Sequence, residues 1–179
     1  MKTSPVPIKP PFFAALKSTN YLPNALAVLD AQAGGFHQGI FVDASGHVAE
    51  GPNMNVAALM HDGTLVLPPD GACLAGVTAA RAMALLQGAL GRGSVDGVAR
   101  VARRPLSVEE AKGAAEVMLL GSSLPVMPVV QWDDARVGDG APGMAALQLR
   151  ALLQADMAPR EGSGVHTPVP YGYLTGMGA

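Results

Sequence analysis

The pair Asp62-Gly63 restricts the possible folds of this chain more than any other short segment. It separates two apolar segments, Val56–Met60 and Leu65–Leu67. Asp-Gly suits the positive φ angles of a tight turn, so the two segments are predicted to form a β-hairpin. Pro68-Pro69 then ends the second strand, because proline cannot donate a ladder hydrogen bond. Hairpins interrupt the strand–helix–strand alternation that a doubly wound sheet requires, so that fold is excluded.

The remaining periodic segments predict helices and strands in mixed order. Leucines and alanines recur at helical spacing from Tyr21 to Ala33, and Pro23 fits a first helical turn. Ser107 and Glu110 have the spacing of a capping box that begins a short helix. Further helices are expected over 142–157 and from Thr78 to about Ala89, the latter closed by Gly91 and Gly93. Strands are expected over 39–42, 47–50, 98–102, 117–120 and 126–131. The fold class is therefore predicted to be mixed α/β (α+β-like), with hairpin-linked strands and covering helices.

Composition divides the chain into three parts. Residues 1–11 contain four prolines and are expected to form a linker or first extended segment. Residues 12–158 hold the periodic segments and are expected to form one domain. Residues 159–179 are rich in glycine and proline without periodicity, so a flexible tail is expected there.

Charge and composition exclude several classes of function. The formal net charge is −2 and aromatic residues make up 4% of the chain, so nucleic-acid binding is not expected. No apolar run reaches about 18 residues, and no secretory signal is evident, so no membrane association is expected and the chain as written is predicted to be cytoplasmic. Cys73 is the only cysteine and the four histidines are scattered, so neither a disulfide nor a metal site is predicted.

Four short segments carry residues suited to one cofactor. They are a lysine at Lys17, a carboxylate at Glu50, and the turns Gly76-Val77-Thr78 and Ser122-Ser123. A lysine amine can form a Schiff base with the aldehyde of pyridoxal 5'-phosphate. A carboxylate keeps the pyridine nitrogen protonated, and amide groups at a helix N-terminus receive phosphate. Each residue also has a simpler interpretation: a surface lysine, a solvated strand-end carboxylate, a helix N-cap at Thr78 and an ordinary serine turn.

Several longer segments resemble the class IV pyridoxal-phosphate enzymes. They run from Lys17 to Asn24, from Val48 to Val56 and from Glu109 to Glu116, and the likeness extends from about Thr3 to about Tyr171. It is greatest to the plant and algal group of D-amino-acid transaminases and aminodeoxychorismate lyases. The resemblance implies the pseudo-barrel large domain of that family, pyridoxal 5'-phosphate as cofactor, amino acids and 2-oxo acids as substrates, and a homodimer.

The resemblance also assigns roles to individual residues. Lys17 corresponds to the catalytic lysine, and Glu50 corresponds to the glutamate that pairs with the pyridine nitrogen. The cofactor-binding turns correspond to Gly76, Val77 and Thr78, and to Ser122 and Ser123. Independently of the resemblance, Asn53 and Asn55 are expected to brace the loop that follows Glu50 through side-chain to backbone hydrogen bonds, as asparagines in turns commonly do. Tyr21 lies one residue nearer the lysine than the tyrosine of branched-chain aminotransferases, so a core position is expected for it.

One departure from the family concerns the start of the chain. Family members carry a smaller N-terminal domain before the lysine segment, which supplies an arginine to the cofactor phosphate. This chain begins almost at the lysine segment, so we expect the small domain to be absent, together with any plastid transit peptide.

Three functions are therefore expected from the sequence. The first is a class IV aminotransferase of the D-amino-acid or branched-chain type. The second is an aminodeoxychorismate lyase that makes 4-aminobenzoate and pyruvate. The segment Leu124–Val129 resembles the sequences of such lyases. The third is a truncated domain that is weakly active or serves only in binding.

Overall fold

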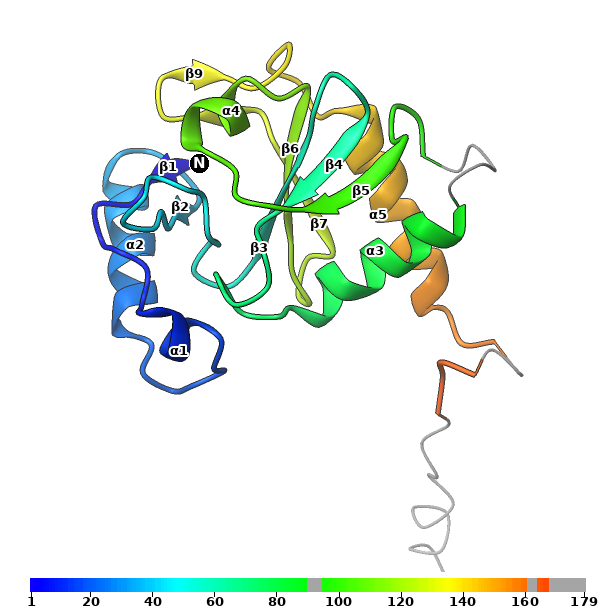
Figure 1. Ribbon diagram of the computed structural model, residues 1–179, viewed down its shortest axis with the longest axis horizontal. Helices are drawn as coiled ribbons and strands as arrows, with labels where there is room; N and C mark the ends of the chain where they lie inside the picture. Colours follow the sequence, from blue (N-terminus) through cyan, green and yellow to red (C-terminus); the bar gives the residue numbers. More distant parts are fainter. Residues whose placement is uncertain (90–94, 161–163, 168–179) are drawn as a thin grey trace, which may run out of the picture.

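A five-stranded mixed sheet with the order β5-β4-β3-β6-β7 lies at the centre of the protein (Figure 1). The computed structural model describes residues 1–89, 95–160 and 164–167. The strands of this sheet are β3 (Asn55–Leu59), β4 (Thr64–Leu67), β5 (Arg100–Arg103), β6 (Glu116–Leu120) and β7 (Val126–Val129). Three of the four pairings are antiparallel, and only β4 and β5 run parallel. The predicted mixed α/β fold is thus confirmed.

The predicted hairpin forms, although only Gly63 of the Asp62-Gly63 pair adopts a positive φ, and the amide of Gly63 donates to the carbonyl of Met60 at 3.0 Å. Gly63 has a φ of 79°, which a residue with a side chain rarely adopts. The Asp62 carboxylate accepts a hydrogen bond from the amide of Thr64 at 2.9 Å, and the amide of Met60 donates to the carbonyl of Thr64 at 2.8 Å. These bonds fix the register of β3 and β4.

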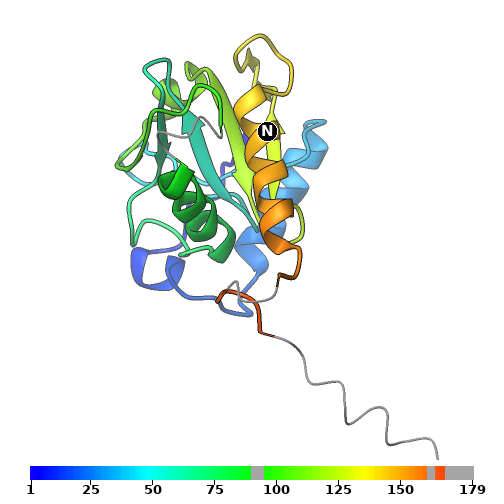
Figure 2. The same ribbon diagram turned by 90° about the vertical axis from the view of Figure 1, so that its right-hand side faces the viewer.

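Both faces of the central strand β3 are buried. Ala57 and Leu59 face helices α3 (Val77–Ala89) and α5 (Met144–Met157), which lie together over one side of the sheet (Figure 2). Val56 and Ala58 face the other side and pack with residues such as Trp132. Successive side chains of a strand point to opposite faces, and both faces are covered here, so all five residues of β3 are buried. Four of them are apolar, and the side chain of the fifth, Asn55, is hydrogen-bonded.

Two carboxylates hold the covering helices in place. The Glu116 carboxylate on β6 accepts hydrogen bonds from the amides of Ala145 and Ala146, both at 2.9 Å, and so caps the N-terminus of α5. Asp156, in the last turn of α5, receives two hydrogen bonds from the guanidinium of Arg81 on α3, at 2.6 and 2.7 Å. The two helices are therefore tied to the sheet and to each other.

Shorter elements cover the opposite side of the sheet. They are β1 (Lys2–Thr3), which pairs parallel with β2 (Gly39–Ile40), α1 (Pro11–Ala14), α2 (Leu22–Ala33), α4 (Val108–Lys112), and the hairpin of β8 (Gln131–Trp132) and β9 (Ala135–Arg136). Met1 is buried in the core cluster that contains Trp132. The N-terminal residues are extended, but they pack into the domain and do not stand apart as a linker.

Several element boundaries differ from the sequence predictions. The expected strand over 47–50 exists only as three isolated bridges, Val42 with Val48, His47 with Ser107, and Glu50 with Asn55. The expected strand over 126–131 is divided into β7 and β8, and α5 begins at Met144. The expected closure of α3 at Gly91 and Gly93 lies outside the described residues, as does most of the segment 159–179.

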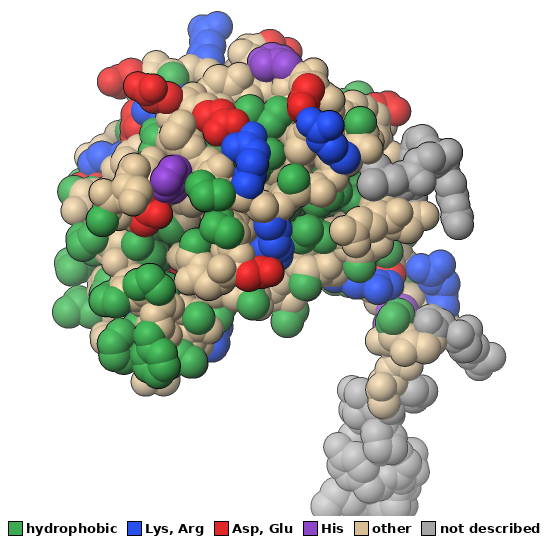
Figure 3. Space-filling model, in the orientation of Figure 1, with side chains coloured by type: hydrophobic (Ala, Val, Ile, Leu, Met, Phe, Trp, Pro, Cys, Tyr) green, Lys and Arg blue, Asp and Glu red, His purple; other side chains and the backbone are tan. Residues whose placement is uncertain are grey.

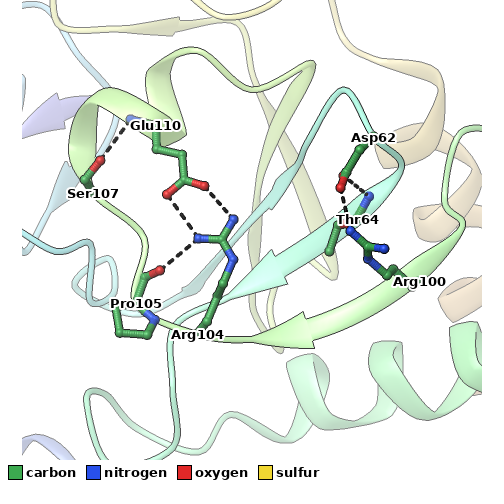
Figure 4. A network of polar contacts seen from close by, with 7 residues as sticks. All are labelled: Asp62, Thr64, Arg100, Arg104, Pro105, Ser107 and Glu110. Atoms are coloured by element: carbon green, nitrogen blue, oxygen red, sulfur yellow. Dashed lines mark hydrogen bonds and ion pairs between the residues drawn. The ribbon is translucent and has the colours of Figure 1, made fainter.

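Charged residues line the edge strand β5 (Figure 4). Arg100 pairs with Asp62 at 2.6 Å, and the guanidinium of Arg104 binds the Glu110 carboxylate. Ser107 Oγ accepts a hydrogen bond from the amide of Glu110 at 3.1 Å, so the predicted cap of α4 forms. The Glu110 side chain, however, pairs with Arg104, which lowers the pKa of that carboxyl. Charges on an edge strand discourage further strand pairing.

Apolar side chains are exposed over α1 and α2, at the lower left of Figure 3. Phe12 is 73% exposed, and Leu22 and Leu29 on α2 are also exposed. None of the helices in the described ranges is long and apolar enough to cross a membrane. Phe12, Leu22 and Leu29 belong to an outward apolar surface on the two helices, which we call the α1–α2 face.

Candidate functional site

A cavity of about 370 Å³ lies at the end of the sheet where Asn55, the first residue of β3, pairs with Leu120, the last residue of β6. Seven of the eight site residues predicted from the sequence line this cavity: Lys17, Glu50, Asn55, Gly76, Val77, Thr78 and Ser122. Ser123 is exposed and is not among the lining residues. Segments far apart in the chain therefore meet at one place.

Lys17 lies in the exposed loop between α1 and α2. Buried Ala14 anchors the loop on one side, and α2 begins at Leu22 on the other. Within the described ranges, no hydrogen bond or ion pair involves the Lys17 side chain. The Lys17 side chain at the cavity wall thus has no polar partner among the described residues.

Glu50 is the buried carboxylate of the cavity. It is 7% exposed, and its Oε2 accepts a hydrogen bond from the amide of Leu74 at 3.1 Å. Burial raises the pKa of Glu50, while the Leu74 amide and the positive charges of Lys9 and Lys17 act in the opposite direction. A desolvated carboxylate in this position favours a cationic partner in the cavity.

Asn55 holds the segment that leads into α3. Its Nδ2 donates to the carbonyl of Leu74 at 2.8 Å and contacts Cys73 Sγ at 3.7 Å. Leu74 is thus held at both backbone groups, because its amide binds Glu50 and its carbonyl binds Asn55. Gly76 packs directly against the side-chain oxygen of Asn55. Glu50 and Asn55 together set the path of residues 74–76.

The N-terminus of α3 opens onto the cavity. Gly76, Val77 and Thr78 line it, and the carbonyl of Gly76 accepts the first helical hydrogen bond, from Ala80 at 3.0 Å. The helix begins at Val77, so Thr78 lies in its first turn and the N-cap interpretation of Thr78 was wrong. The free amide groups and the helix dipole at this end attract an anion. Ser122 contributes a hydroxyl to the same cavity from the β6–β7 turn.

Several residues that line the cavity were not predicted from the sequence, and one, Tyr21, was misplaced. Lys9, Ser18 and Asn24 also line the cavity, and Tyr21, which was expected in the core, is 47% exposed at the cavity wall. Asn24 could have been found, because it occupies the buried stripe of α2 together with Ala27 and Ala31. A polar residue in an otherwise apolar stripe calls for a hydrogen-bonding partner. Lys9 gave no such signal, because it stands in an extended segment without periodicity.

Comparison with known proteins identifies the family. Residues 2–132 match the amino-transferase class IV family. The chain belongs to this family. Its members depend on pyridoxal phosphate, and the family, fold class and type of cofactor expected from the sequence are thereby confirmed.

Two relatives show how much of a family member this chain represents. The chloroplastic D-amino-acid transaminase of Arabidopsis thaliana is 44% identical over 170 residues, which are 94% of this chain and 44% of that protein. A probable branched-chain-amino-acid aminotransferase of Aquifex aeolicus is 31% identical over 130 residues, or 73% of this chain and 40% of that protein. The chain therefore spans less than half the length of these curated relatives.

Solved structures agree with this assignment. The T.th. branched-chain amino acid aminotransferase, complexed with N-(5'-phosphopyridoxyl)-L-glutamate, has a TM-score of 0.76 and 27% identity; the match covers 89% of this chain and 53% of that one. The same enzyme has also been solved with pyridoxamine 5'-phosphate. The described fold is thus that of the corresponding half of a class IV aminotransferase.

Proposed function

We propose that this chain forms the cofactor-binding half of an aminotransferase that moves an amino group between a D-amino acid and a 2-oxo acid. The observation that carries the proposal is the meeting of Lys17, the buried Glu50 and the N-terminus of α3 around one cavity. A reactive amine, a desolvated carboxylate and an anion-binding helix end match the aldehyde, the pyridine nitrogen and the phosphate of pyridoxal 5'-phosphate.

The residues present fit this cofactor. The cavity volume of about 370 Å³ is in the range of small-ligand pockets. Lys17 would hold the aldehyde carbon, Glu50 the pyridine nitrogen, and Gly76, Val77, Thr78 and Ser122 the phosphate, with Asn55 bracing Leu74 behind Glu50. The role of Ser123 is restricted to supporting the turn that carries Ser122. When bound, the cofactor supplies an electron sink for negative charge that develops on the substrate.

The side chains of this chain then perform the proton chemistry. With pyridoxal 5'-phosphate bound, the Lys17 amine would accept the proton from the substrate α-carbon and hold it at Nζ. Glu50 keeps a positive charge on the pyridine nitrogen through its own negative charge. Asn55 fixes Leu74, whose amide donates to Glu50 and orients its carboxylate. Each step uses a group that already faces the cavity.

The relatives support a proposed substrate class. The D-amino-acid transaminase of Arabidopsis thaliana matches 94% of this chain at 44% identity, so D-amino acids are the proposed amino donors. Branched-chain amino acids are a second candidate, because the Aquifex aeolicus relative and the T.th. structure carry that name. The name of the Arabidopsis relative also supports a plastid location for the protein that contains this chain.

Covalent trapping tests the cofactor site. The chain is mixed with pyridoxal 5'-phosphate, reduced with borohydride and digested, and we expect the modified peptide to carry Lys17. Lys17→Ala should abolish this label, whereas Lys9→Ala, a change of the other lysine in the cavity, should retain it. A label that persists in Lys17→Ala at the wild-type level would refute the assignment.

Substrate preference is tested on the same preparations. Transfer from D-alanine or from L-leucine to 2-oxoglutarate is measured with this chain and with a longer protein that carries a family N-terminal domain. Faster transfer from D-alanine supports the proposal, and faster transfer from L-leucine favours the branched-chain candidate.

The family likeness also motivates the proposal that the α1–α2 face joins two copies as a homodimer. Light scattering of Leu22→Glu with Leu29→Glu should then report a smaller mass than wild type.

A further inference from the structure

We infer that Asn24 is a positioning residue that fixes the reactive lysine opposite Glu50, by bonding to the carbonyl of Pro52. This inference rests on the proposed function, since it gives Asn24 a role in the reaction of Lys17. Asn24 stands in the first turn of α2, which directly follows the lysine loop. Pro52 stands two residues after Glu50. A bond between them joins the two sides of the cavity.

Two donors from the start of α2 converge on this single carbonyl. Asn24 Nδ2 donates a short hydrogen bond to the oxygen of Pro52, and Tyr21 Oη donates to the same oxygen at 3.4 Å. Both donors line the cavity, as does Pro52 itself. We refer to these two hydrogen bonds as the Pro52 staple.

The surroundings of the staple show why it matters for Lys17. Residues 15–21 are exposed throughout, so packing does not restrain the loop that carries the lysine. On the other side, the amide of Gly51 donates to the carbonyl of Met54 at 2.7 Å, and Glu50 forms a bridge with Asn55 at the start of β3. The Pro52 carbonyl is therefore a rigid point of the sheet side. The staple connects the unrestrained loop to it.

While the Asn24 side-chain nitrogen bonds to Pro52, its side-chain oxygen is left without a hydrogen bond. Asn24 is 5% exposed, and its Oδ1 is buried without a hydrogen-bond partner among the described residues. Buried polar atoms without partners are unfavourable, and an apolar residue would fit the rest of this stripe, which consists of Ala27 and Ala31. An asparagine here is consistent with a positional role and not with the stability of α2.

The test separates position from stability. Asn24→Leu keeps a similar volume but removes both the donor and the unpaired oxygen, and Tyr21→Phe removes only the weaker donor. Gln32→Ala, at an exposed position of the same helix, is the matched control. We measure the melting temperature, the rate of borohydride-trapped labelling of Lys17 and its pH midpoint, and the amide exchange of residues 15–21 without cofactor.

Asn24→Leu is expected to melt close to the control, to exchange amides faster in residues 15–21, and to label Lys17 roughly threefold to tenfold more slowly, the range expected for one lost hydrogen bond. Tyr21→Phe should show a smaller effect in the same direction. Wild-type rates of labelling and exchange in both variants would overturn the inference. If wild type itself is not labelled at Lys17, the proposed function fails, and the exchange data alone then decide whether the staple restrains the loop.

Discussion

Asn55 Oδ1 occupies the space that a side chain at position 76 would need, because a Cβ atom built on Gly76 would lie 1.8 Å from that oxygen. No real Cβ contact is so short, so any residue other than glycine must displace Asn55. Asn55 in turn holds the carbonyl of Leu74, whose amide binds Glu50. Glycine at position 76 thus leaves Asn55 in place, and Asn55 in turn holds Leu74 where its amide can bind the Glu50 carboxylate.

Replacement of this glycine should damage the site locally. We expect Gly76→Ala to lower the free energy of unfolding by about 1–3 kcal/mol, the usual range for an overpacked position, and to weaken cofactor binding. Gly88→Ala on α3 is the control, since nothing lies within 4 Å of its Cβ position. Alanine there should stabilise the helix by about 0.5–1 kcal/mol. Denaturant unfolding measures both, and equal stability of the two variants would contradict the steric argument.

Glu50 should make the cofactor-free protein less stable as the pH rises. Burial raises its pKa above the ordinary value of 4.5, so the folded state holds this proton more tightly than the unfolded state does. The resulting stabilisation is present below the ordinary pKa and is lost as the pH rises through the raised pKa.

Glu50→Gln imitates the protonated carboxyl and should remove this dependence. At neutral pH the variant should be at least as stable as wild type, but it should lose turnover in a longer, active protein, because the negative charge is needed there. Thermal melts across the acid-to-neutral range measure the effect, with exposed Glu109→Gln as the control. Melting curves of wild type and Glu50→Gln that shift in parallel with pH would rule it out.

The pair of Arg81 and Asp156 should give the opposite pH response. The hydrogen bonds from Arg81 lower the pKa of Asp156 below its ordinary value of 3.8. This stabilisation is therefore present above the ordinary pKa and is lost as the pH falls through the lowered one. We expect Arg81→Gln to melt below wild type at neutral pH and to approach it in acid. Asp134→Asn, at an exposed position, should track wild type at every pH; a constant gap for Arg81→Gln would show that the ion pair is not the cause.

Cys73 should resist alkylation in the folded protein. Burial raises the pKa of its thiol to about 11, and the charge of Glu50 acts in the same direction. Only the thiolate reacts, so iodoacetamide at neutral pH should modify Cys73 roughly a hundredfold more slowly than a free cysteine. The rate should recover in denaturant. Rapid labelling of the native chain would mean that the segment 73–76 opens readily.

The sequence predicted those features whose cause is local. The turn at Asp62-Gly63 and the cap at Ser107 formed as expected, because each depends on residues within one turn. Lys17, Glu50 and the start of α3 could be selected as candidates, because their residue types suit one chemistry.

Features that depend on tertiary contacts could not be read in this way. Tyr21 was wrongly expected in the core, since its position depends on the carbonyl of Pro52. β1 was missed, because a two-residue strand is defined only by its partner β2. Lys9 lines the cavity next to Ile8, which packs against Ala27 and Phe41, and no periodicity in the sequence records this packing.

The cavity is lined by residues from Lys9 to Ser122, including Asn55 and Leu120, which pair at the end of the sheet. Contacts between such distant segments must close a loop before they stabilise the chain, so we expect them to form late in refolding. The ability of Lys17 to capture an aldehyde at this place should therefore appear only after β3 and β6 have joined. The rate at which Lys17 acquires its covalent label after dilution from denaturant would accordingly report how fast β3 and β6 pair.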